Sequence, residues 1–133
     1  MARLETMTTK NVRPKFLNLF RIHLPVTGVV SFAHRVSGAL LVIFLPLVVF
    51  LFAYSLQSEQ GFEQVIALLH SWWGKAAMVL ILWALLSHLL SGVRFLLLDL
   101  DIGIRLTPAR VSAWSVAGLA LLILILLVSG VFL

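Results

Sequence analysis

Three long apolar runs dominate the sequence and restrict the folds that are open to it. They cover residues 29–56, 68–98 and 111–133, and the last of them contains no charged residue. A helix needs about 20 apolar residues to cross a hydrocarbon core of about 30 Å, so each run is long enough. A transmembrane barrel needs at least about eight strands of alternating polarity, which three continuous apolar runs cannot supply. We therefore predict an all-α membrane protein with three transmembrane helices.

Composition agrees with this class and narrows the chemistry. Hydrophobic residues make up 62% of the chain and charged residues 11%, whereas soluble domains are about half apolar and about a quarter charged. The length suits a single membrane-anchor domain over residues 1–133. The absence of cysteine excludes disulfides and thiolate metal sites. The sequence also lacks a dinucleotide fingerprint and a phosphate-binding loop, so we expect no complete active site in this chain alone.

The basic residues predict the orientation of the spans. Most of them precede the first run or lie near the end of the second run and in the loop after it, at Arg3, Lys10, Arg13, Lys15, Arg21, Arg94, Arg105 and Arg110, whereas the loop after the first run carries Glu59 and Glu63. Positive residues mark the cytoplasmic side. We therefore expect residues 1–28 in the cytoplasm and the C-terminus outside. The net charge of +5 follows from this topology, and no soluble basic face predicts nucleic-acid binding.

Smaller features give three local expectations. Pro46 lies inside the first run and is expected to kink that helix, because proline removes a backbone donor. Residues 58–63 are polar and predict a short loop. Asp99 and Asp101 are expected to pair with Arg94 or Arg105 at the cytoplasmic end of the second span.

A polar stripe marks the start of the first span. Ser31, His34, Arg35 and Gly38 are spaced i, i+3, i+4 and i+7, so they share one face of a helix. A single arginine at a helix end can reach the lipid headgroups by extending its side chain. A serine and a glycine on the same stripe are not needed for that, so the pattern favours a ligand site.

A histidine lies deep in the second span. His88 stands among leucines, about 16 Å from Asp99 along the helix axis, and Ser91 and Gly92 leave room beside it for a flat group or a close helix. Such a histidine could simply bond to a neighbouring helix. Ionisable groups inside membranes are usually functional, however, and imidazole is the commonest protein ligand of haem iron. The glycine one turn away favours a ligand role.

Together these motifs resemble a known family. The sequence is similar to the cytochrome b subunits of bacterial succinate dehydrogenase, the larger of the two small membrane anchors of respiratory complex II. The resemblance covers nearly the whole chain and is carried by Arg13-Pro14, by Ser31-x-x-His34-Arg35-x-Ser37-Gly38 and by His88-x-x-x-Gly92-Val93-Arg94-Phe95-x-x-x-Asp99.

The resemblance implies roles for four residues. It implies a b-type haem shared between two anchor subunits, with His88 as this chain's axial ligand to the iron. His34 and Arg35 match residues that approach the haem propionates. Ser31 and Arg35 match positions that line a ubiquinone site near the cytoplasmic face.

The resemblance also implies partners and a location. The partners are a second small membrane anchor that supplies the other haem ligand, an iron–sulfur subunit, a flavoprotein subunit and membrane lipid, and the location is the bacterial cytoplasmic (inner) membrane. Electrons from succinate would reach ubiquinone there. Two alternatives remain open from the residues: an anchor of a quinol:fumarate reductase, and a small non-redox scaffold or transport subunit. The last alternative predicts acidic groups deep in the spans, which the sequence does not contain.

Overall fold

Residues 24–132 form four helices in the computed structural model. These are α1 (Val26–Ser55), α2 (Glu59–His70), α3 (Trp72–Asp99) and α4 (Leu106–Phe132). Of these, α1, α3 and α4 are long and apolar enough to cross a membrane, which confirms the three predicted spans. The Arg13-Pro14 pair and most of the expected cytoplasmic segment 1–28 lie outside the described residues.

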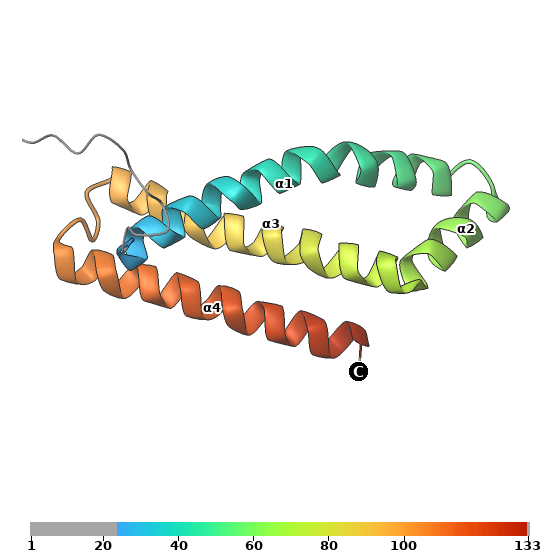
Figure 1. Cartoon of the computed structure of the whole chain (residues 1–133). Coiled ribbons are helices and arrows are strands. Elements are labelled where there is room, and N and C mark those ends of the chain that lie inside the picture. Colours follow the sequence, from blue (N-terminus) through green and yellow to red (C-terminus); the bar gives the residue numbers. More distant parts are fainter. Residues whose placement is uncertain (1–23, 133) are drawn as a thin grey trace, which may run out of the picture.

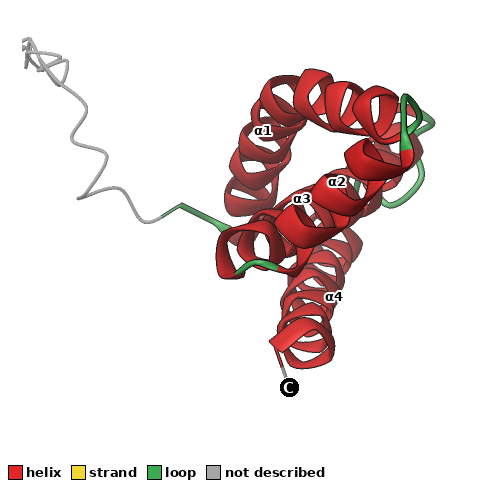
Figure 2. Cartoon of the chain, turned by 90° about the vertical axis from the view of Figure 1, so that its right-hand side faces the viewer, coloured by secondary structure: helices red, strands yellow, loops and turns green. Residues whose placement is uncertain are grey.

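The three long helices run side by side. Figure 1 shows α3 between α1 and α4, and the view in Figure 2 agrees. Each of the three contacts the other two. The start of α1, the end of α3 and the start of α4 lie together at one end of the molecule, and α2 lies at the other. This arrangement brings the polar start of the first span beside the second half of α3.

The sequence-based expectation of a loop at residues 58–63 was wrong, because a short helix, α2, begins at Glu59. Ser58 follows the short turn after α1 in an extended conformation, and its side-chain oxygen accepts a hydrogen bond from the Gly61 amide at 3.0 Å. Serine is among the preferred residues at this capping position, because it satisfies an amide that the first turn leaves free. The cap therefore allows a polar segment to start a helix immediately after the first span.

A second serine separates α2 from α3. Ser71 ends α2 in an extended conformation and also caps α3, because its side chain accepts from the Gly74 amide at 3.1 Å. The second span therefore begins at Trp72, whereas residues 68–70 of the expected span belong to α2. Gly74 is buried at this corner, where an added Cβ would collide with the Leu68 carbonyl. The corner needs glycine at that position.

The helix α1 is bowed along its length (Figure 1), and Pro46 lies inside it. Proline lacks the amide that the helical ladder requires and crowds the preceding turn, so helices bend at it. The bend carries the second half of α1 away from α3, and α2 bridges the two helices at that end.

Small and polar side chains make up the contact surface between the helices. Within residues 24–132, the buried apolar residues are Val30, Val79, Ala84 and Ala113, and the buried polar ones are Ser37, Ser87, Ser91 and Arg94. Many large apolar side chains are exposed instead, among them Phe32, Trp73 and Trp114. Membrane helices pack in this way, since small residues allow close approach while lipid covers the apolar exterior.

Candidate functional site

Two histidines from different spans meet at the α1–α3 contact. The imidazole rings of His34 and His88 are stacked, with centroids 4.0 Å apart and planes inclined by 12°. Phe95 packs its ring edgewise against His34 at 5.2 Å. The sequence predicted each histidine separately, and the pairing of α1 with α3 brings them into one cluster.

Hydrogen bonds orient the His88 ring from one side. Its Nδ1 lies 3.0 Å from the backbone carbonyl oxygen of His34 and 3.2 Å from the Ser37 hydroxyl oxygen. The Ser37 hydroxyl itself donates to the same carbonyl at 2.9 Å. Because a carbonyl oxygen can only accept, the His88 Nδ1 carries the proton and donates. The Nε2 atom of a neutral His88 therefore keeps a free lone pair, as in histidines that ligate metals.

Two glycines make the close approach of α1 and α3 possible. A Cβ added to Gly38 would lie 2.9 Å from Cε1 of His88 and 3.3 Å from its Nδ1. A Cβ added to Gly92 would lie 3.5 Å from Nε2 of His34. Each histidine thus lies over a glycine of the other helix, and the fit is tighter at Gly38.

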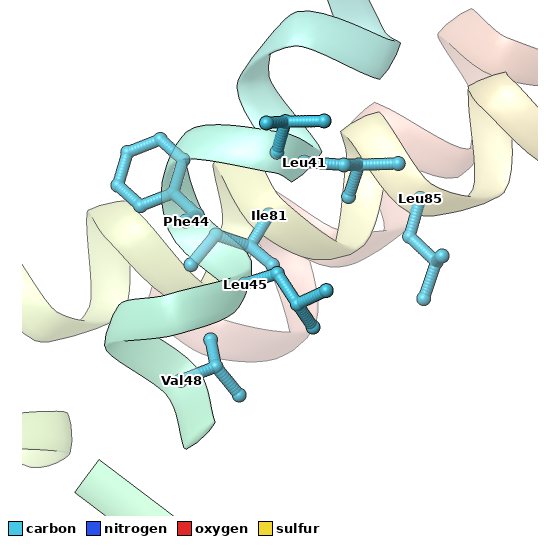
Figure 3. Close-up of a pocket in the computed structure, with 7 residues that line it drawn as sticks. Leu41, Phe44, Leu45, Val48, Ile81 and Leu85 are labelled. Atoms are coloured by element: carbon cyan, nitrogen blue, oxygen red, sulfur yellow. The ribbon is translucent and has the colours of Figure 1, made fainter. Parts of the chain in front are cut away.

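An apolar groove begins one turn along from the His88–Gly38 contact. Its volume is about 350 Å³, and its walls are apolar side chains from α1 and α3 (Figure 3), namely Leu41, Val42, Phe44, Leu45, Val48, Ile81 and Leu85. The groove can accept a flat, apolar group next to the histidine cluster, because its walls carry no polar side chain that would need a hydrogen-bond partner.

The other two predicted site residues lie on the same part of α1 but outside the cluster. Ser31 is half-buried, and Arg35 is exposed. Within residues 24–132, neither side chain makes a hydrogen bond. Both residues lie at the end of the bundle where α1 begins.

The expected pairing of Arg94 with Asp99 or Asp101 was wrong. Arg94 is buried, and its Nε donates to the Ser112 hydroxyl at 3.0 Å while its Nη2 donates to the Ala109 carbonyl at 3.1 Å. Asp99 lies five residues along the same helix, beyond the three- or four-residue spacing at which helical side chains meet. Neither this α3–α4 contact nor the contact of Ser37 with His88 was predicted from the sequence.

Comparison with known proteins identifies the family. The family described as succinate dehydrogenase/fumarate reductase transmembrane subunit matches residues 9–127. The chain belongs to this family. It is a multi-pass membrane subunit of the succinate dehydrogenase/fumarate reductase kind, as the motifs at His34 and His88 predicted.

Two relatives cover most of the chain. The succinate dehydrogenase cytochrome b556 subunit of Coxiella burnetii is 35% identical over 105 residues, which are 78% of this chain and 84% of the relative. The subunit of the same name from Paracoccus denitrificans is 30% identical over 122 residues, covering 90% of this chain and 94% of the relative. The family match over residues 9–127 therefore covers α1 and α3 completely and most of α4.

Proposed function

We propose that this chain is the cytochrome b anchor of a succinate:ubiquinone oxidoreductase, with His88 as one axial ligand of a b-type haem. The observation that carries the proposal is the hydrogen bond from His88 Nδ1 to the His34 carbonyl, at 3.0 Å. It fixes the tautomer in which Nε2 can bind iron, and such second bonds also raise the basicity of a ligating imidazole. The two relatives are named cytochrome b556 subunits, which supports a b-type haem.

The surroundings of His88 fit a haem. Gly38 leaves the space beside the imidazole that any side chain would fill, and the apolar groove that includes Leu85 lies one turn away. A bound haem would supply one-electron exchange at its iron. The protein holds the imidazole through Ser37 and the His34 carbonyl. The other axial ligand is assigned to the second small anchor subunit.

Two residues at the start of α1 are proposed to bind the quinone. Ser31 and Arg35 are one helical turn apart, so a hydroxyl and a guanidinium can approach the same edge of a ligand. Reduction places negative charge on a quinone carbonyl oxygen, and donors held there in a low-dielectric site stabilise that charge. Arg35 and His34 are further assigned to the anionic haem propionates, because charged hydrogen bonds are the strong ones.

The orientation and the partners follow from the charges and the family. We assign the end of the bundle that holds Arg35, Arg105 and Arg110 to the cytoplasm of a bacterium, because basic residues gather there. The iron–sulfur and flavoprotein subunits would dock on that face. We assign succinate oxidation to those partner subunits.

A difference spectrum tests the haem assignment. Membranes containing the chain with its partner subunits are measured as dithionite-reduced minus oxidised absorbance, for wild type, His88→Ala and His70→Ala. His70 is an exposed histidine at the end of α2, so its variant is the matched control. We expect a b-type α-band that is lost or shifted only in His88→Ala. An unchanged band in His88→Ala, with the complex assembled, would refute the ligand assignment.

The direction of electron flow distinguishes this proposal from its nearest alternative. A quinol:fumarate reductase anchor would use the same fold, and the matching family includes both enzymes. Both relatives are named as subunits of succinate dehydrogenase, which favours succinate oxidation. Family membership favours either anchor over a non-redox scaffold or transport subunit.

A further inference from the structure

A buried arginine lies outside the histidine cluster, at the α3–α4 contact. Arg94 is 5% exposed, although it lies only about 7–8 Å inside the end of α3. Arginine stays charged in proteins, and a charge taken out of water is costly unless an opposite charge accompanies it. The environment of this guanidinium should therefore include an anion.

The contacts that surround Arg94 are neutral. Its Nε and Nη2 donate to the hydroxyl of Ser112 and the carbonyl of Ala109, and the guanidinium carbon lies 5.3 Å from the centre of the Phe95 ring. A guanidinium has five N–H donors, and these two bonds use only part of that capacity. Within residues 24–132 no carboxylate forms an ion pair with it, and Asp99 is exposed.

A pocket of about 400 Å³ lies beside this guanidinium. It is formed by α3, α4 and the loop between them, and Arg94, Ser112 and Ser115 provide its polar groups. Leucine and valine side chains of α3 form an apolar wall next to them, at Val93, Leu97 and Leu98. The pocket thus combines one charged donor group with a strip suited to a hydrocarbon chain.

We propose that this pocket binds the phosphate of an anionic phospholipid, with Arg94 as its charged donor. A phosphate oxygen can accept the remaining guanidinium hydrogens, which are arranged for such oxygens. The acyl chain would follow the apolar wall of α3.

Lipid retention by the assembled complex tests the proposal without reference to haem or quinone. The complex is delipidated in detergent, exposed to phosphatidylcholine vesicles containing a minor fraction of phosphatidylglycerol, re-isolated and analysed for bound lipid by mass spectrometry. Wild type, Arg94→Gln and Arg105→Gln are compared. Loss of a charged hydrogen bond weakens binding about tenfold or more, so Arg94→Gln should retain about one phosphatidylglycerol fewer per complex. Arg105→Gln, an exposed charge change, should retain the wild-type amount.

A second variant keeps the test decisive if Arg94→Gln fails to assemble. Ser115→Leu fills the pocket and leaves both hydrogen bonds of Arg94 in place, because among residues 24–132 the Ser115 hydroxyl bonds only to the Val111 carbonyl of its own helix. It should show the same loss of phosphatidylglycerol. Wild-type retention in an assembled Arg94→Gln or Ser115→Leu complex overturns the proposal. Displacement of the lipid by inorganic phosphate also overturns it, because the pocket would then be a free-anion site.

Discussion

The tight contact between Gly38 and His88 makes Gly38→Ala an informative substitution. The new Cβ would lie 2.9 Å from Cε1 of His88, about half an ångström short of ordinary van der Waals contact. The ring cannot simply turn away, because it is stacked on His34 at 4.0 Å and bonded at Nδ1 to the His34 carbonyl at 3.0 Å. Overpacking of this kind costs about 1–3 kcal/mol. We expect Gly38→Ala either to lower the stability of the complex by this amount or to displace the His88 imidazole.

The matched control is Gly92→Ala in the same interface. Its Cβ would meet only Nε2 of His34, at 3.5 Å, which is an ordinary contact. The assay combines the thermal unfolding midpoint of the purified complex with the reduced-minus-oxidised spectrum. Gly38→Ala should lower the midpoint or shift the α-band, and Gly92→Ala should change neither. If the two variants behave alike, the reasoning from the His88 contact is refuted.

Two further substitutions test separate parts of the molecule. Arg35→Ala should reduce quinone reductase activity more than haem content, because the exposed guanidinium is assigned to the quinone. Arg110→Ala is the control, and equal quinone reductase activity in the two variants would contradict the assignment. Trp83→Phe removes the bond from Nε1 to the Ala120 carbonyl at 2.8 Å and should cost about 1 kcal/mol of stability. Thermal unfolding measures this loss, which the exposed Trp114→Phe should not share.

Hydropathy alone was sufficient to predict the three spans, because only transmembrane helices shield so many consecutive apolar residues from water. The helix α2 was missed because its sequence, Glu59–His70, mixes charged and apolar residues. The serines that cap α2 and α3 were visible in the sequence, at Ser58 and Ser71. Serine before a glutamate or before an apolar run is a helix-start signal, and it would have placed both boundaries.

The histidine cluster was only partly predictable. The one-face spacing singled out His34, and burial among leucines singled out His88, but their stacking depends on how α1 and α3 pair. Gly38 and Gly92 carried the relevant signal, since small residues mark close helix contacts. The partners of Arg94 lie on another helix, 15 and 18 residues along the chain. No periodicity within α3 could indicate them.

Two side chains of α3 donate hydrogen bonds to backbone carbonyls of α4, and these bonds have a consequence for how the two helices can move. Trp83 and Arg94 are eleven residues apart on α3, and their carbonyl acceptors, Ala120 and Ala109, are eleven residues apart on α4. Eleven residues span about three turns, or about 16 Å, so both bonds share one stripe and one register. A slide of α4 by one turn, about 5.4 Å, breaks both together. Sliding between these helices is therefore all-or-none, and α4 stays in a single register while either bond holds.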